Sequence, residues 1–186
     1  MTSKRLYQRL VKTLLTLVVV AILAIFNPPQ TSLVKKETVI PSSSSSIVYA
    51  IVTRVVDGDT IIVNADGETQ KIRLIGVDTP EVVDPRKLVQ CFGEEASAKT
   101  KATLLNNRVR LESDSSQGDR DKYDRLLRYV FLEDGINFNL LLIKEGFAHE
   151  YTYRLPYKYQ DQFKQAQKNA RLQEKGLWAK GVCEEN

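Results

Sequence analysis

The chain has 186 residues, 42% hydrophobic and 27% charged, a composition typical of one globular domain with some additional length. Its net charge of +4 does not indicate a basic nucleic-acid-binding domain. Residues 1–46 carry six basic residues and one acidic residue, whereas residues 47–186 carry 21 basic and 22 acidic residues. The positive excess therefore belongs to the N-terminal segment. One histidine and two cysteines exclude a zinc site made of several His or Cys ligands, so any metal would be held by oxygen atoms.

The N-terminal part of the chain has the layout of an export signal. Residues 1–12 are polar and basic, and residues 13–26 (TLLTLVVVAILAIF) are an uninterrupted run of apolar residues and threonine. Residues 1–26 are therefore predicted to be either a cleaved signal peptide or an N-terminal anchor that associates with the membrane through residues 10–26. Both alternatives predict an extracytoplasmic protein, secreted or anchored. Residues 27–46, with three prolines and five consecutive serines, are predicted to be a flexible linker.

The remaining residues, 47–186, are predicted to form one domain. Runs of β-branched residues bounded by turn signals predict five strands, at 47–56, 60–64, 69–77, 108–113 and 126–132. Helix-forming composition and capping residues predict three helices, at 93–106, 137–145 and 157–174. Five short strands with a helix between the third and the fourth is the order of an OB-fold, so the predicted fold class is a five-stranded OB-fold β-barrel with α-helices.

Three carboxylates form the candidate chemical centre. Asp59 follows the turn between the first two strands, and Asp78 and Glu81 follow the third strand. Because neighbouring strands lie about 4.8 Å apart, these acids can converge, and they would repel one another without a cation. Ca²⁺ binds several carboxylate and carbonyl oxygens, and the proline after Thr79 fixes the direction of the Thr79 carbonyl. Taken alone, however, the segment 57–60 (DGDT) is more often only a turn.

Two arginines are predicted to lie beside these acids. Arg73 is on the third strand and Arg125 precedes the fifth. Two guanidinium groups beside a metal suit a phosphodiester, which gains negative charge as its phosphorus becomes five-coordinate. The metal would act as a Lewis acid, and Glu81 would remove a proton from the attacking water or orient it. For either arginine alone, a surface ion pair is the alternative.

The order and spacing of these motifs resemble the staphylococcal nuclease, or thermonuclease, family. The family motifs D-G-D-T, R-x-x-x-x-D-[TA]-P-E and D-x-Y-[GD]-R match residues 57–60, 73–81 and 121–125, and the resemblance covers 47–180. It implies an OB-fold barrel with three helices and a Ca²⁺-dependent endonuclease that hydrolyses DNA and RNA. Nothing in the sequence indicates oligomerisation, so a monomer is expected.

The resemblance also implies a role for each metal-binding and catalytic residue. Asp59, Asp78 and the carbonyl of Thr79 would bind calcium, and Glu81 would be the general base or the water-orienting group. The two arginines would hold the phosphate.

Four further residues are implied to bind substrate. Lys122 and Tyr123 would contact a terminal phosphate. Tyr151 and Tyr153 resemble a pair of tyrosines that flank a base, which suits sequence-tolerant binding of single strands; packing beside the last helix is the alternative for both.

The two cysteines and the histidine lie outside these motifs. Cys91 precedes the first predicted helix and Cys183 lies in the C-terminal tail. In an exported protein such a pair favours a disulfide, which would pin the tail beside the active-site loop, and two free thiols are the alternative. His149 is expected to be a packing or surface residue.

The predicted function is therefore a calcium-dependent nuclease, a hydrolase that cleaves phosphodiester bonds by metal-assisted attack of water. One alternative is a non-catalytic OB-fold protein that binds single-stranded nucleic acid, and another is a membrane-anchored interaction protein. The three acids favour catalysis, because a pure binding module has no use for converging carboxylates that repel phosphate.

Overall fold

The computed structural model describes residue 7, residues 48–82 and residues 89–183. Apart from Tyr7, the predicted signal peptide or anchor at 1–26 and the predicted linker at 27–46 lie outside the described residues. Within the described part of the chain, no helix combines the length and the apolar character needed to cross a bilayer.

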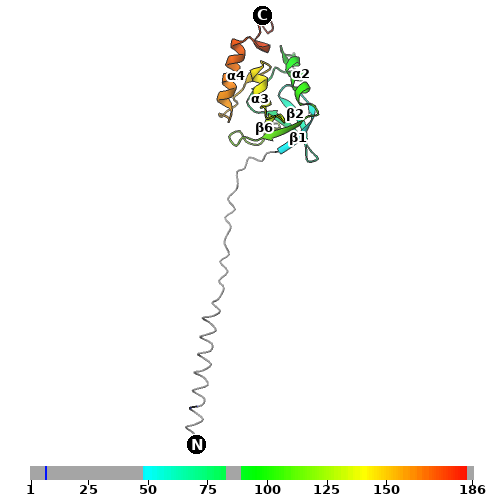
Figure 1. The fold of residues 1–186 in the computed structure, drawn as a ribbon, viewed down its shortest axis with the longest axis vertical. Coiled ribbons are helices and arrows are strands. Elements are labelled where there is room, and N and C mark those ends of the chain that lie inside the picture. Colours follow the sequence, from blue (N-terminus) through cyan, green and yellow to red (C-terminus); the bar gives the residue numbers. More distant parts are fainter. Residues whose placement is uncertain (1–6, 8–47, 83–88, 184–186) are drawn as a thin grey trace. The chain divides into compact units, whose positions relative to one another are not determined.

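The domain is built on a closed five-stranded barrel with the strand order β1-β2-β3-β6-β5 (Figure 1). The first three strands form an antiparallel meander, β3 and β6 run parallel, and β5 closes the barrel by antiparallel pairing with β1 and β6. The predicted OB-fold barrel is therefore confirmed. The strand bounds are β1 Val48–Val55, β2 Thr60–Ala65, β3 Glu68–Leu74, β5 Arg108–Glu112 and β6 Leu126–Phe131.

Three α-helices occur in the described part of this domain, as predicted: α2 (Gly93–Leu104), α3 (Phe138–Lys144) and α4 (Gln160–Leu172). A short 3₁₀ helix, η1 (Gly176–Trp178), follows α4. The predicted cap of the middle helix is present, because the Asn137 side chain accepts a hydrogen bond from the Leu140 N–H group at 3.2 Å.

The third strand is shorter than predicted. The prediction extended it to residue 77, but β3 ends at Leu74 and the chain turns at Gly76, whose φ is +75°. After the turn, β4 (Val77–Asp78) pairs with β7 (His149–Glu150), and Asp78 lies opposite His149. The prediction was wrong because the apolar alternation continues through the turn. This break turns Asp78 out of the barrel sheet. The last helix likewise begins at residue 160, three residues later than the predicted 157.

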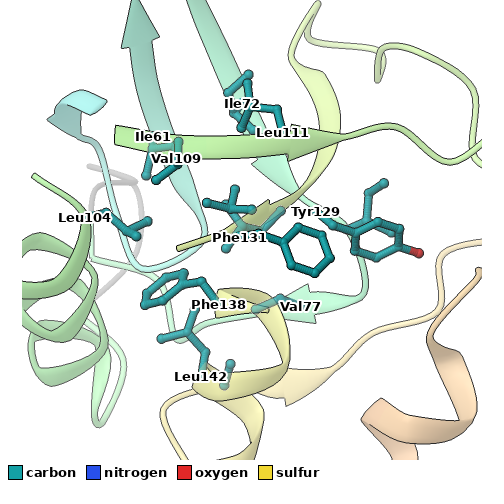
Figure 2. Packing of buried hydrophobic residues seen from close by; sticks show 14 of the residues in the cluster. Ile61, Ile72, Val77, Leu104, Val109, Leu111, Tyr129, Phe131, Phe138 and Leu142 are labelled. Carbon is teal, nitrogen blue, oxygen red and sulfur yellow. The ribbon is translucent and has the colours of Figure 1, made fainter. Parts of the chain in front are cut away.

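Alternate strand residues and one helix fill the barrel. Ile61 and Ile72 point inward from β2 and β3, where both are fully buried, and Phe138 and Leu142 of α3 meet the strand side chains from one side (Figure 2). This apolar, closely packed interior fixes the strands, and therefore fixes the strand ends that carry the candidate site.

Candidate active site

The turn between β1 and β2 holds Asp59 against the end of β3. The Asp59 N–H group donates to Asp57 Oδ1 at 3.1 Å, and the Asp59 carbonyl accepts from the Leu74 N–H group at 2.9 Å. Gly58 is required between the two aspartates, because a Cβ atom there would lie 2.7 Å from Thr79 Cγ2. The Asp59 side chain is consequently almost buried, with 6% of the residue exposed.

Asp59 connects the turn to the segment that follows β4. Asp59 Oδ2 accepts a hydrogen bond from the Thr79 N–H group at 3.0 Å and lies 3.0 Å from Arg73 Nη2. The same Nη2 atom lies 3.3 Å from Asp78 Oδ1. The predicted metal ligands and one predicted phosphate clamp are thus brought together around one guanidinium group.

Arg73 and Arg125 are both held rigidly. Arg73 Nη1 donates to the carbonyl oxygens of Leu74 and Val77 at 2.9 and 2.6 Å. Arg125 donates through Nε to Asp121 Oδ2 at 2.7 Å and through Nη1 to Thr60 Oγ1 at 3.2 Å. Although partial burial opposes it, hydrogen bonds from Arg125 and nearby backbone N–H groups hold the pKa of Asp121 below its usual value. Asp121 therefore stays charged and orients Arg125.

The site opens into two adjoining cavities. The smaller, about 340 Å³, is lined by every predicted metal-binding and catalytic residue: Asp59, Arg73, Asp78, Thr79, Glu81 and Arg125. The larger, about 630 Å³, is lined by all four predicted substrate-binding residues: Lys122, Tyr123, Tyr151 and Tyr153. Tyr123 and both arginines line the two cavities in common. The structure therefore places the two predicted groups of residues side by side.

The tyrosines of the larger cavity are available for contact with a ligand. Tyr151 and Tyr153 are 43% and 60% exposed, and their ring centroids lie 6.3 Å apart. In the loop before β6, the centroid of the Tyr123 ring lies 4.9 Å from Lys122 Nζ and 5.4 Å from Arg125 Cζ. The packing alternative is less favourable for residues this exposed.

Sequence reasoning missed one residue of this site. Asp57 lines the smaller cavity. Its burial and, to a smaller extent, the neighbouring Asp59 carboxylate raise the pKa of Asp57 to about 6. Asp57 is the first residue of the D-G-D-T motif, but it was given no role, because an aspartate followed by glycine is also expected in a tight turn.

The donor set of the smaller cavity fits a hard cation. Partial burial raises the pKa of Asp78, and the Asp59 and Glu81 carboxylates raise it further, against the opposing effects of Arg73 and His149. The smaller cavity is lined by four carboxylates and two guanidinium groups, so its negative charge is incompletely balanced, and all candidate donors are oxygens, as Ca²⁺ prefers. Among the described residues, no group of three or more His, Cys, Asp or Glu side chains has the spacing of a metal site, and a carbonyl oxygen would have to complete the set.

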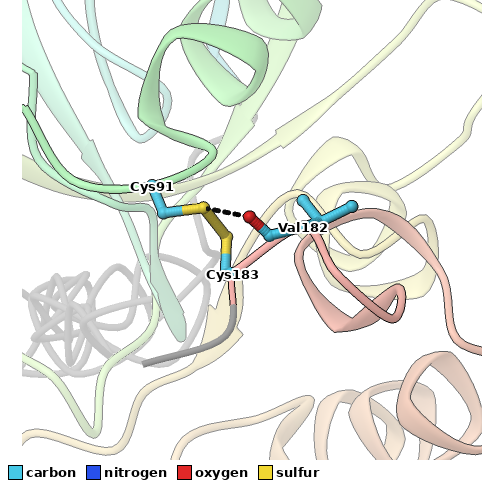
Figure 3. The surroundings of a disulfide bond; sticks show 3 residues. All are labelled: Cys91, Val182 and Cys183. Atoms are coloured by element: carbon cyan, nitrogen blue, oxygen red, sulfur yellow. Dashed lines mark hydrogen bonds between the residues drawn. A yellow bond between two sulfur atoms is a disulfide. The ribbon is translucent and has the colours of Figure 1, made fainter. Parts of the chain in front are cut away.

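The cysteines and the histidine have structural surroundings. Cys91 and Cys183, which are 92 positions apart in the sequence, form a disulfide (Figure 3). The His149 ring packs edge-on against Trp178, with ring centroids 4.8 Å apart. Burial lowers the pKa of His149, so the ring is neutral near pH 7.

Comparison with known proteins gives consistent matches over this domain. Residues 71–180 match the family model described as staphylococcal nuclease homologue. The chain is 48% identical over 138 residues to a thermonuclease of Staphylococcus hyicus, covering 74% of this chain and 79% of that protein. It is 48% identical over 128 residues to a thermonuclease of Staphylococcus intermedius, covering 69% and 74%. It is 39% identical over 140 residues to Endonuclease YncB of Bacillus subtilis, covering 74% and 65%.

Proposed function

The chain belongs to the staphylococcal nuclease family, and we propose that it is a calcium-dependent nuclease that hydrolyses phosphodiester bonds of DNA and RNA. The relatives named as thermonucleases and endonuclease support hydrolysis of nucleic acid. The observation that carries the proposal is the position of Arg73, whose guanidinium lies between the carboxylates of Asp59 and Asp78 in a cavity that Glu81 and Arg125 also line.

Asp59, Asp78 and the Thr79 carbonyl are the proposed calcium ligands, with Asp57 close by. Bound calcium would supply Lewis-acid chemistry, stabilising the charge that develops on the phosphate oxygens. The Asp59 carboxylate is itself pre-positioned, because it is fixed by the Thr79 N–H group and by Arg73. Little reorganisation is then needed when substrate binds.

The two arginines are proposed to hold the phosphate. Arg125 is anchored by Asp121 and Thr60, and Arg73 by two backbone carbonyls, so each guanidinium presents a fixed positive charge to the smaller cavity. Fixed donors stabilise the additional negative charge of five-coordinate phosphorus without a further entropic cost.

Glu81 is proposed to act on the attacking water. It lines the smaller cavity, and its Oε1 atom accepts a hydrogen bond from the Val82 N–H group at 3.0 Å, which fixes the carboxylate relative to its own backbone. From there Glu81 removes a proton from water, or orients the water, as the new P–O bond forms and the bond to the leaving oxygen breaks.

The larger cavity is proposed to receive the nucleotide. Lys122 and Tyr123 would contact a terminal phosphate, while the exposed rings of Tyr151 and Tyr153 offer apolar faces to a base. Stacking does not depend on base identity, which suits a nuclease of broad sequence tolerance.

The test is cleavage of single-stranded DNA and of RNA by the full-length chain, with Ca²⁺ and again after addition of EGTA. Cleavage that needs calcium supports the proposal. Binding without cleavage under both conditions would instead support a non-catalytic OB-fold protein.

We also propose an extracytoplasmic location, secreted or anchored through residues 1–26. The Cys91–Cys183 disulfide supports this, because disulfides persist in oxidising compartments. N-terminal sequencing of the protein from its native cells distinguishes a cleaved signal from a retained anchor, and recovery of the protein in the cytoplasm would contradict both.

A further inference from the structure

Gln90 forms hydrogen bonds with both the N–H group and the carbonyl group of Glu81. The Glu81 N–H group donates to Gln90 Oε1 at 2.7 Å, and the Gln90 N–H group donates to the Glu81 carbonyl at 2.9 Å. These two hydrogen bonds connect residues nine positions apart, and they fix the two peptide units on either side of the Glu81 Cα atom, from which the side chain projects.

Helix α2 holds Gln90 in turn. The Gln90 carbonyl accepts a hydrogen bond from the N–H group of Gly93, the first residue of α2, at 3.0 Å. The helix start lies directly against the same backbone, because a Cβ atom on Gly93 would lie 3.0 Å from the Pro80 carbonyl oxygen and 3.4 Å from that of Glu81. A side chain at position 93 would therefore push the helix and the Glu81 segment apart.

The disulfide gives Gln90 a second anchor. Cys91, the next residue, is bonded to Cys183, and its Sγ atom lies 3.0 Å from the Val182 carbonyl oxygen (Figure 3). The C-terminal segment is itself attached to the domain, since Leu177 is buried and its N–H group donates to the Gly146 carbonyl at 2.8 Å. Gln90 is therefore attached to two fixed points, to α2 directly and to the C-terminal segment through Cys91.

We propose that Gln90 is a positioning residue for Glu81, kept in place by α2 and by the Cys91–Cys183 disulfide. Gln90 is exposed and is not among the residues that line either cavity, so it acts on catalysis through Glu81 and not by touching substrate. The inference rests on the proposed function, in which Glu81 acts on the attacking water. A displaced carboxylate slows the chemical step and leaves substrate binding unchanged.

The test compares Gln90→Leu, which removes the acceptor, with Gln90→Glu, which retains a carboxylate oxygen in its place. With single-stranded DNA and saturating Ca²⁺, Gln90→Leu of the full-length chain should lower kcat by about tenfold with KM within about twofold of wild type. Gln90→Glu should keep kcat within about threefold. Gln165→Leu, the same substitution at an exposed position of α4, is the matched control, and circular dichroism confirms that each variant is folded.

The outcomes separate the two proposals. If wild type shows no calcium-dependent cleavage, the proposed function fails. If wild type is active but Gln90→Leu retains its kcat, or if Gln90→Glu loses as much activity as Gln90→Leu, the positioning role of Gln90 is wrong. The double variant Cys91→Ser/Cys183→Ser should lower kcat about threefold or more at unchanged KM, and an undiminished kcat would contradict the anchoring role of the disulfide.

Discussion

Arg73 Nη2 lies 3.0 Å from Asp59 Oδ2, and both side chains are largely removed from solvent, with 13% and 8% of their surfaces exposed. Removing one partner of such a pair leaves the other charge buried without compensation. Substitution of either residue is therefore expected to affect both the stability of the site and its chemistry.

Arg73→Ala should lower kcat/KM by about 10²–10³-fold, because it removes a fixed positive charge from the developing phosphorane and leaves Asp59 without its guanidinium partner. Steady-state cleavage of a DNA oligonucleotide measures the loss, and Arg54→Ala, at an exposed position of β1, is the matched control. A loss smaller than about fivefold would exclude a phosphate-binding role for Arg73.

Asp57→Asn should stabilise the protein at neutral pH without divalent cations, by about 1 kcal/mol. Burial raises the pKa of Asp57 to about 6, above the ordinary 3.8, so above pH 6 folding bears the cost of a buried charge that asparagine lacks. Asparagine retains the acceptor for the Asp59 N–H group. Urea unfolding measures the change, with the exposed Asp66→Asn as control. A less stable variant would show that Asp57 is stabilising in its charged form.

Asp114 should account for part of the acid sensitivity of the fold. It accepts hydrogen bonds from the Tyr129 hydroxyl at 2.7 Å and the Lys158 N–H group at 2.8 Å. Burial opposes ionisation, but these hydrogen bonds prevail and hold the pKa of Asp114 below 3.8. Its stabilising effect is therefore complete above the ordinary pKa and is lost as the pH falls below it.

Asp114→Asn should accordingly lower the free energy of unfolding at pH 7 by about 1.5–3 kcal/mol and should flatten its decline below pH 4. Denaturant unfolding at several pH values measures both effects. An equal decline in variant and wild type would assign the acid sensitivity to other carboxylates.

Tyr153→Ala should raise KM for single-stranded DNA by about tenfold, because one base–aromatic stack contributes about 1–3 kcal/mol to binding. The substitution should leave kcat within about threefold, since the ring lies in the larger cavity away from Glu81. Tyr49→Ala, which removes an exposed tyrosine of β1, is the control. An unchanged KM would favour the packing role for Tyr153.

Local patterns predicted most of the barrel. In β2, the buried residues Ile61 and Val63 alternate with more exposed ones, and Asp-Gly turns mark both of its ends. The helix cap at Asn137 is also a local signal. Such features depend on near neighbours in the sequence, so they can be read without knowledge of the fold.

Contacts distant in sequence could not be predicted in this way. The pairing of Asp78 with His149 joins two-residue strands that have no periodicity of their own. Asp57 belongs to the D-G-D-T motif but has the residue type of an ordinary turn, and its burial beside Asp59 comes from the fold. Gln90 belongs to no motif, because its proposed role depends on a hydrogen bond from Glu81 that the fold creates.

Calcium binding and cleavage measured on the same preparation test the central claim most directly. Calorimetric titration with Ca²⁺ and initial rates of DNA cleavage at the same free Ca²⁺ concentrations should give coincident midpoints for wild type. Glu81→Gln should bind calcium with similar affinity while losing about 10²-fold or more of the rate. Cleavage that persists in EGTA, or full activity of Glu81→Gln, would contradict a calcium-dependent nuclease that uses Glu81 on the attacking water.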